Sequence, residues 1–574
     1  MIRRVLFLCF ALLPIAPWNS AIRFPYQGSE AFDLVIRGGR VLDGSGNPWF
    51  EADVGIRGGR IAAVGDLHAV KANRVIDAGG KHVVPGFIDI HSHSDDGIAN
   101  PDLRFNLNMI AQGITLSVLN QDGRNPQWPV RDQKARYESM KIGNNVALMV
   151  GHGTLRNMVM RQRSHEAATN ADIREMQKLV EEGMRDGAFG LSTGLEYVPG
   201  RFSEPREVVE LTRVIRPFGG FYISHERSEG KDPMWKTASD PSPSVDLLEA
   251  VQETINIGQE TGVPVICSHL KAKGANFWGS SFAATRLIQE ARDRGIQVYA
   301  DQYTYDTSGT DGNTVLLPLW SLVAPGAQVG GQLDERRGMF KNLKGDFQAR
   351  LKDPETARKI RLDIAHEIER RGGASRIVVY EFPDQHYVEK SLEWIATDLK
   401  QSPVEAAIWL QLNGFDRPGG CRMRGYSLSE LDIENIMRQE FTATCTDGDT
   451  VRFGEGVPHP RFYGTFPRKI RRYVLERNVI SLPFAIRSMT SLPAQIMGLR
   501  ERGMIRVGNW ADLVIFDLQT IADKATFTQP HQYPSGIPYV FVNGVAAVDD
   551  GKITHATPGK VLTPATDGRM KPPK

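Results

Sequence analysis

The sequence predicts an α/β protein: a TIM-like (β/α)8 barrel, a small β-sandwich domain formed by both chain ends, and an insertion between strands 7 and 8. Three observations predict this architecture. Apolar runs of strand length alternate with amphipathic stretches through the middle of the chain, the two ends carry similar short runs punctuated by glycine, and about 130 residues separate the seventh run from the eighth. An open doubly wound sheet is the structural alternative, because periodicity alone does not exclude it.

Residues 1–21 are typical of a signal peptide. Arg3 and Arg4 precede an apolar run over residues 5–16 that is too short to span a bilayer comfortably. We therefore expect export to the periplasm or the extracellular space, without a membrane span in the mature chain. An uncleaved membrane anchor is the alternative. The net charge of +2, from 69 basic and 67 acidic residues, gives no electrostatic reason to expect a nucleic-acid partner.

The β-sandwich domain is predicted over residues 30–82 and 490–565, from short strand-like runs at both ends. These runs are Leu34–Ile36, Val54–Ile56 and Ile61–Val64 near the start, and Leu513–Phe516 and Tyr539–Gly544 near the end. Because the two ends look alike, we expect the domain to form by pairing the beginning of the chain with its end.

The barrel is predicted over residues 83–489. Its strand-like runs are Val83–His91, Thr115–Leu119, Val146–His152, Ala188–Ser192, Phe221–His225, Val263–His269, Val298–Tyr303 and Thr442–Asp447. Helical spacing appears between them, as at Ile173, Met176 and Val180, and Ser427-x-x-Glu430 is typical of a capping box that opens a helix. The insertion covers residues 311–440. It could close the barrel mouth as a lid, or it could be a peripheral decoration.

Histidines and carboxylates follow most of these runs. They are His91, His93, Asp122, His152, His225, His269 and Asp447. The carboxyl ends of barrel strands meet at one rim, where chemistry is assembled from several strands. Two histidines one residue apart in an extended segment also point to the same face, where they can converge on a divalent ion. Each residue alone has an ordinary structural explanation, but together they predict a metal site.

A zinc site at this rim would supply two effects that amide hydrolysis needs. Zinc with nitrogen and oxygen ligands lowers the pKa of bound water towards roughly 7 and polarises a carbonyl oxygen. Another group must take a proton from the nucleophile and pass it to the leaving amine. Asp447 is the candidate for this general base and acid; the alternative is that it only orients a ligand histidine.

Short motifs along residues 33–555 add a family resemblance. They are Pro85–Asp95, Gly113–Thr115, Val150–Arg156, Gly190–Tyr197, Ser268–Lys271, Thr446–Gly448 and His459–Arg468, followed by Arg502–Gly503, Ala511–Val514 and Tyr533–Ile537. In these motifs the sequence resembles the amidohydrolase superfamily and, within it, the N-acyl-D-amino-acid deacylases, or D-aminoacylases. The resemblance assigns the proton-transfer role to the aspartate that matches Asp447.

The resemblance also implies a set of metal ligands. It assigns a tightly bound zinc to His225 and His269, and a second, weaker position to His91 and His93. The third ligand of the tight site is commonly a cysteine in a Gly-Asn-Cys-Gly turn, where this chain has Asn120-Gln121-Asp122-Gly123. Asp122 could coordinate or bridge zinc, although a carboxylate would change affinity and metal preference. We expect one or two zinc ions.

For the substrate, the resemblance places Arg461 against the carboxylate of an N-acyl amino acid, which a planar guanidinium can hold with two contacts. The other candidate substrate contacts are Tyr197, Lys271, Tyr303 and His152. The segment Asp301–Thr310 departs from the family's Tyr-Pro-Tyr pattern. Thr304 replaces the proline and Gly309 stands where serine is common, so Ser308 could substitute.

The sequence thus predicts a zinc-dependent hydrolase of linear amides that converts N-acyl-D-amino acids to a carboxylate and a free D-amino acid. A cyclic amidase of the dihydroorotase or hydantoinase kind shares the metal rim and is the second enzyme hypothesis, although Arg461 followed by Gly464-Thr465-Phe466 favours the deacylase. The third hypothesis is a non-catalytic barrel scaffold. Loss of several metal ligands would indicate a scaffold, whereas here only the cysteine position differs from the family's ligand set.

Overall fold

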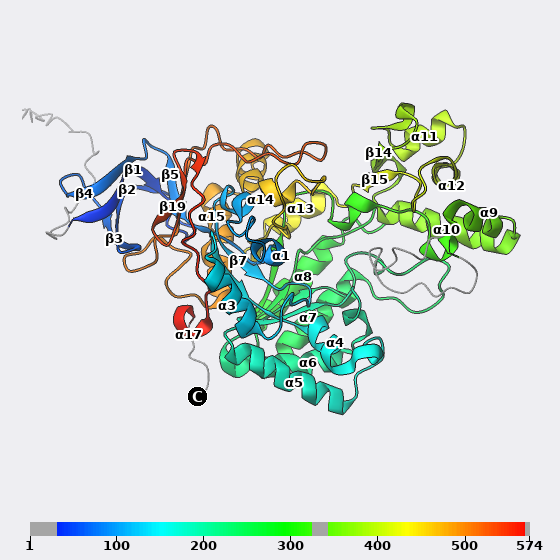
Figure 1. The fold of residues 1–574 in the computed structure, drawn as a ribbon, viewed down its shortest axis with the longest axis horizontal. Coiled ribbons are helices and arrows are strands. Elements are labelled where there is room, and N and C mark those ends of the chain that lie inside the picture. The colour runs from blue at the N-terminus through cyan, green and yellow to red at the C-terminus, as the bar shows by residue number, and fades with distance from the viewer. Residues whose placement is uncertain (1–30, 324–341, 569–574) are drawn as a thin grey trace, which may run out of the picture.

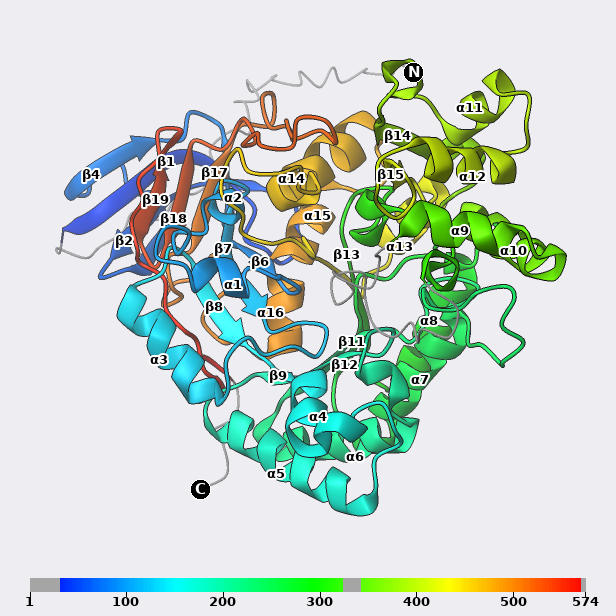
Figure 2. The ribbon, with the colours of Figure 1, turned by 45° about the vertical axis from the view of Figure 1, so that its right-hand side comes forward.

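The computed structural model describes residues 31–323 and 342–568 of the 574-residue chain. The expected signal peptide lies outside these residues. Figures 1 and 2 show a central barrel with a sheet from both chain ends on one side and the insertion on the other. None of the helices in the described ranges is long and apolar enough to cross a membrane.

Strands from both chain ends share one sheet, the terminal sheet, which has nine strands within the described residues. These are β1 (Phe32–Val41), β2 (Phe50–Arg57), β3 (Arg60–Gly65), β4 (Ala72–Asp77), β5 (His82–Pro85), β17 (Leu513–Phe516), β18 (Tyr539–Val542), β19 (Val545–Asp549) and β20 (Lys552–Ile553). The antiparallel pairing of β5 with β17 joins the two ends. Val54, Val83, Leu513 and Phe541 belong to one buried apolar cluster, so side chains from both ends stabilise the join.

The barrel consists of parallel strands in the predicted order. Its strands are β6 (Phe87–Asp89), β7 (Ile114–Leu119), β8 (Asn145–Leu148) continued by β9 (Val150–Gly151), β10 (Gly190–Gly194), β11 (Phe221–His225), β12 (Val265–Cys267), β13 (Val298–Gln302) and β16 (Thr442–Thr444). Beyond the last strand, the Asp447 N–H donates to the His91 carbonyl at 3.0 Å and the His93 N–H donates to the Gly448 carbonyl at 2.8 Å. These bonds join the last strand to the first. The ring is therefore closed, and the open doubly wound sheet is excluded.

The apolar run Val83–His91 forms two strands in different sheets, and the expectation of a single strand was wrong. The chain passes from β5 to β6 at Gly86, whose N–H donates to the Asp512 carbonyl at 2.7 Å. A β-carbon at Gly86 would lie 2.2 Å from Thr115 Oγ1, so only glycine fits there. Both strands are buried, and a continuous apolar run therefore gives no sign of the crossing.

Helices surround the barrel. Those outside the insertion are α1 (Asp95–Ile98), α2 (Leu107–Ile110), α3 (Val130–Met140), α4 (His152–Met160), α5 (Asn170–Arg185), α6 (Pro205–Ile215), α7 (Leu247–Thr261), α8 (Ser281–Asp293), α13 (Glu430–Met437), α14 (Arg461–Arg468) with a π-helix after it (Lys469–Glu476), α15 (Leu482–Met489), α16 (Ser491–Met497) and α17 (Pro564–Asp567). The predicted capping box is corrected. Ser429 caps α13 by accepting a hydrogen bond from the Leu431 N–H, whereas Ser427 Oγ donates to Asp311 at 2.6 Å.

The insertion has a core of its own. Its elements are α9 (Leu343–Leu351), α10 (Pro354–Arg370), β14 (Ile377–Glu381), α11 (Leu392–Asp398), α12 (Pro403–Asn413) and β15 (Arg422–Gly425), of which β14 and β15 pair antiparallel. Phe347, Ile364, Val379 and Leu410 pack in an apolar cluster separate from the barrel core. Its last strand, β15, leads back to the barrel through α13. The insertion starts with a 3₁₀ turn, Thr310–Asn313, where Thr310 Oγ1 accepts a hydrogen bond at 2.9 Å from Lys273 Nζ, in the loop after β12.

Candidate metal centre

Five predicted metal ligands converge at the carboxyl ends of four barrel strands. His91 and His93 follow β6, Asp122 follows β7, His225 ends β11 and His269 follows β12. Their donor atoms form two groups that share Asp122: His91, His93 and Asp122, and Asp122, His225 and His269. Within each group all donor atoms lie within 4.8 Å of one another.

The distances within the two groups suit tetrahedral coordination. Ligand atoms about 2.0–2.2 Å from a tetrahedral ion are about 3.3–3.6 Å from each other. Asp122 Oδ1 lies 3.6 Å from His91 Nε2 and 3.8 Å from His269 Nε2, and Asp122 Oδ2 lies 3.4 Å from His93 Nε2. The His225 Nδ1 to His269 Nε2 distance is 3.0 Å. Asp122 Oδ1 is buried and has no hydrogen-bond partner, as expected of an atom kept for an ion. The residues therefore fit one or two zinc ions.

Further polar groups orient the histidines from behind. Ser268 Oγ donates to Asp301 Oδ2 at 3.0 Å and lies 2.6 Å from His91 Nδ1, which leaves Nε2 of His91 facing Asp122. On His225, Nε2 lies 3.0 Å from Glu196 Oε2, so that Nδ1 faces the cluster. Such partners fix the tautomer and the ring orientation of a metal-binding histidine.

Glu196 and Glu229 were not among the predicted site residues. Glu229 Oε1 lies 3.2 Å from His269 Nδ1, and its side chain also forms an ion pair with Lys271. Burial raises the pKa of Glu229, but the charges of Lys271 and His225 outweigh burial and hold it well below its usual value. Glu196 stands in the Gly190–Tyr197 motif, which was a usable signal. Glu229 lies in a loop after β11, and nothing in the local pattern distinguishes it.

Three of the site residues have left-handed backbone conformations. The φ angles are 53° at Asp122, 34° at His269 and 47° at Asp447. Such angles are uncommon for residues with a side chain, and they persist where the surrounding structure holds the backbone. Here the His269 N–H donates to Asp301 and the Asp447 N–H to the His91 carbonyl.

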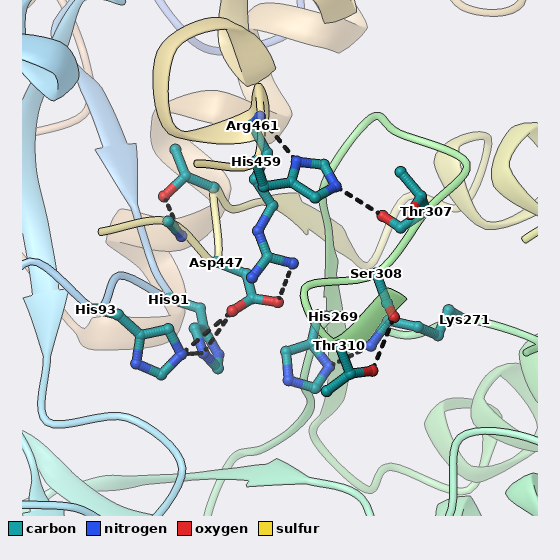
Figure 3. A network of polar contacts seen from close by, with 12 residues as sticks. His91, His93, His269, Lys271, Thr307, Ser308, Thr310, Asp447, His459 and Arg461 are labelled. Carbon is teal, nitrogen blue, oxygen red and sulfur yellow. Dashed lines mark hydrogen bonds and ion pairs between the residues drawn. The ribbon is translucent and has the colours of Figure 1, made fainter. Parts of the chain in front are cut away.

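One carboxylate oxygen of Asp447 faces the metal cluster, and the other faces Arg461. Its Oδ1 lies 3.2 Å from His93 Nε2, and its Oδ2 forms an ion pair with Arg461 Nη1 at 2.8 Å. Figure 3 shows the guanidinium reaching to this carboxylate, which lies between the His91 and His93 pair and His269. Burial raises the pKa of Asp447, but Arg461 and His269 outweigh burial and hold it well below the usual range. The carboxylate is therefore ionised at neutral pH.

Tyr197, Lys271 and Tyr303 lie beside the same cluster. The Tyr197 ring centroid is 4.2 Å from that of His225, and Lys271 Nζ lies 2.8 Å from His269 Nδ1. Tyr303 lies under the Arg461 guanidinium at 4.8 Å, and its buried hydroxyl has no hydrogen-bond partner. The structure thus brings four of the five predicted substrate contacts to one place.

His152 is placed differently from the other predicted substrate contacts. The β9 strand ends at Gly151, and His152 is the first residue of α4. Its Nε2 lies 2.7 Å from Glu207 Oε1, and Glu207 also pairs with Arg156. This buried network connects α4 with α6, so one ring nitrogen of His152 is already used to join two helices. Within the described residues, His152 forms no hydrogen bond or ion pair with the metal cluster.

Comparison with known proteins agrees with this geometry. A model of the amidohydrolase family matches residues 74–262 and 440–548. An N-acyl-D-glutamate deacylase of Alcaligenes xylosoxydans xylosoxydans is 32% identical over 556 residues, which cover 93% of this chain and 97% of that protein.

Solved structures agree as well. A structure of D-aminoacylase, which has a binuclear metal center, superposes on this chain with a TM-score of 0.68 at 31% identity. The match covers 93% of this chain and 100% of the D-aminoacylase chain. An N-acyl-D-glutamate deacylase from Bordetella bronchiseptica, complexed with zinc and a phosphonate inhibitor, gives 0.69 at 30% identity with the same coverage. The chain therefore belongs to the amidohydrolase family, in the branch of the N-acyl-D-amino-acid deacylases.

Proposed function

We propose that this protein hydrolyses N-acyl-D-amino acids to a carboxylate and a free D-amino acid, with one or two zinc ions in the shared cluster. The observation that carries the proposal is the joint position of Asp122, Asp447 and Arg461. A metal-binding carboxylate, an ionised carboxylate and a buried guanidinium lie within one continuous set of contacts. The deacylase relatives, one of them complexed with zinc, support the same reaction.

The metal ligands would be Asp122, His225 and His269 for one ion, and His91, His93 and Asp122 for a second. When bound, zinc there lowers the pKa of a water molecule and polarises the amide carbonyl. The histidine tautomers set by Ser268 and Glu196 present unprotonated nitrogens to the cluster, as such ligands must.

Asp447 is placed to move the proton. Arg461 occupies Oδ2, so that Oδ1 remains directed at the cluster beside His93. Because the carboxylate is ionised, it can accept a proton from the attacking water and then donate that proton to the leaving amine nitrogen. The backbone hydrogen bond from Asp447 to the His91 carbonyl holds this carboxylate over the metal ligands.

Arg461 and Tyr303 would hold the substrate carboxylate. Arg461 is buried, and only one of its terminal nitrogens is used by Asp447. The Tyr303 ring lies against the guanidinium and brings an unpaired hydroxyl donor to the same place. A carboxylate there would receive charge-assisted hydrogen bonds that fix the adjacent amide over the cluster. A hydantoin ring has no such free carboxylate, which favours the deacylase over a hydantoinase.

The test is hydrolysis by the purified protein, with and without added zinc, of N-acetyl-D-amino acids, N-acetyl-L-amino acids and hydantoins. We expect zinc-dependent release of the D-amino acids. The variant Asp447→Asn should lose at least about 100-fold in kcat at unchanged zinc content. Turnover of hydantoins alone would support the cyclic amidase instead, and absence of turnover of every substrate by the zinc-loaded protein would support the scaffold.

A further inference from the structure

Arg424, on strand β15 of the insertion, is buried without an anionic partner. Six arginines are buried in the described residues, and the other five form ion pairs: Arg156, Arg370, Arg371, Arg461 and Arg502. Arg424 is 6% exposed, and its Nη1 has no hydrogen-bond partner. Within the described ranges its guanidinium contacts the face of Phe527, at 4.7 Å from the ring centroid, and forms no ion pair. An aromatic face does not accept the hydrogen bonds of a guanidinium as a carboxylate does.

The guanidinium groups of Arg424 and Arg461 both lie against one short turn. A β-carbon at Gly309 would lie 2.8 Å from Arg461 Nη2, and a β-carbon at Gly312 would lie 3.0 Å from Arg424 Nη2. The two glycines are three residues apart, and the Gly312 N–H donates to the Gly309 carbonyl. Each guanidinium therefore lies against a glycine of the same 3₁₀ turn, where a larger residue would displace it.

Arg424 and Arg461 place two positive charges in one buried region. Burial is the main cause that lowers the pKa of Arg424; Asp311 raises it and the charge of Arg461 lowers it. The ring of His459 lies 5.3 Å from that of Phe527, and burial together with Arg461 and Arg424 holds the pKa of His459 well below its usual value. Asp311 is the carboxylate whose charge raises the pKa of Arg424, but its own oxygens bind Arg371 in an ion pair and Ser427 in a hydrogen bond. Arg461 has Asp447 as its counterion, whereas Arg424 forms no ion pair within the described ranges, so this buried region is suited to an additional negative charge.

The order of these groups indicates which part of a substrate would reach Arg424. Asp447 contacts both the metal ligands and Arg461, whereas Arg424 forms no ion pair with Asp447 or with the metal ligands within the described ranges. An N-acyl amino acid with its amide at the cluster and its α-carboxylate on Arg461 would direct its side chain past Arg461. We propose that Arg424 binds a carboxylate on that side chain, so that the preferred substrates are N-acyl-D-amino acids with an acidic side chain. This inference rests on the deacylase function proposed above.

The experiment compares two substrates of nearly the same shape. N-acetyl-D-glutamate and N-acetyl-D-glutamine differ by one charge, so the ratio of their kcat/KM values isolates recognition of the side-chain carboxylate. We expect the zinc-loaded wild-type protein to favour the glutamate by at least tenfold. Arg424→Met should lower this ratio at least tenfold, mainly through KM, and Arg424→Lys should retain part of it because it keeps the charge. The matched control is Arg422→Met, an exposed arginine on the same strand, which should leave the ratio unchanged.

Each outcome either supports or overturns the inference. A wild-type ratio near one overturns it without any variant, and so does an unchanged ratio in an Arg424→Met protein that melts at the wild-type temperature. If N-succinyl-D-leucine is favoured tenfold over N-acetyl-D-leucine while the glutamate ratio is near one, the anion lies on the acyl group and the side-chain assignment is wrong. Hydrolysis of neutral N-acyl-D-amino acids without acidic preference contradicts only this inference, whereas no hydrolysis of any N-acyl-D-amino acid contradicts the proposed function itself.

Discussion

Asp122→Asn tests the shared carboxylate most directly. Asp122 belongs to both groups of candidate ligands, and its two oxygens lie 3.4–3.9 Å from nitrogens of His91, His93, His225 and His269. The substitution removes the negative charge from both metal positions while it keeps the size of the side chain. It also suits the backbone, because Asn is among the residues that best tolerate the φ of 53° found here.

The expected loss follows from the role of the residue. Removal of a group that only supports a metal ligand typically costs about 10–100-fold in metal affinity. Loss of a direct anionic ligand should cost at least about 100-fold at each position, which corresponds to about 2.7 kcal/mol of binding free energy. His93→Asn, in contrast, should weaken only the position formed with His91, because His93 belongs to only one of the two groups.

The assay is zinc bound per chain, measured by atomic emission after dialysis against buffers of set free zinc concentration. The control is Asp96→Asn, an exposed carboxylate near the rim that pairs with Arg124 and should leave the curve unchanged. If the Asp122→Asn curve superposes on the wild-type curve, Asp122 is not a ligand and the tetrahedral fit described above is incidental. If it weakens only one binding step, the carboxylate serves one ion and not both.

Three further predictions concern residues that are not candidate metal ligands. Ser268→Ala should weaken the zinc position of His91 by about 10–100-fold, because it breaks the chain from His91 to Asp301; equal weakening of both positions in the same dialysis would contradict this. Arg502→Met should lower the free energy of unfolding by about 3–5 kcal/mol in chemical denaturation, since it leaves Asp512 buried and unpaired, and adding Asp512→Asn should recover part of the loss; no recovery would count against the ion pair as the cause. Hydrogen bonding from Arg163 lowers the pKa of Asp172 to about 2 in the folded protein, against about 3.9 in the unfolded chain. The ionised Asp172 therefore stabilises the fold above about pH 3.9, and this stabilisation disappears as the pH falls towards 2. Asp172→Asn should thus melt below the wild type at pH 6 and approach it near pH 3, and a constant difference would refute this linkage.

The convergence of the candidate metal ligands could be predicted from the sequence because barrel strands impose a simple rule. Residues at the carboxyl ends of parallel strands meet at one rim, whatever their separation along the chain. His91, Asp122, His225 and His269 each follow an apolar run, and each lies in the cluster. Glu229 could not be found in this way, because its position depends on the path of the loop after β11 and no periodic pattern encodes that path.

Local details of the fold were harder to predict for similar reasons. Apolar patterns report which residues are buried, but not against which neighbours, and so the crossing between sheets at Gly86 was missed. Ser427 and Ser429 are both plausible caps of α13 from composition, and only the tertiary contact of Ser427 with Asp311 decides between them. Arg424 likewise became significant only when its lack of a partner was visible.

The terminal sheet has a consequence for how the chain is made. Strand β5 pairs with β17, and one residue after β5 the chain enters β6, which leads to His91 and His93. The pairing that anchors the chain just before β6 therefore depends on a strand that leaves the ribosome near the end of synthesis. Contacts between such distant segments form late and slowly. We expect the nascent chain to complete this anchor only after residues 513–516 have emerged, so that the rim reaches its final form late in synthesis.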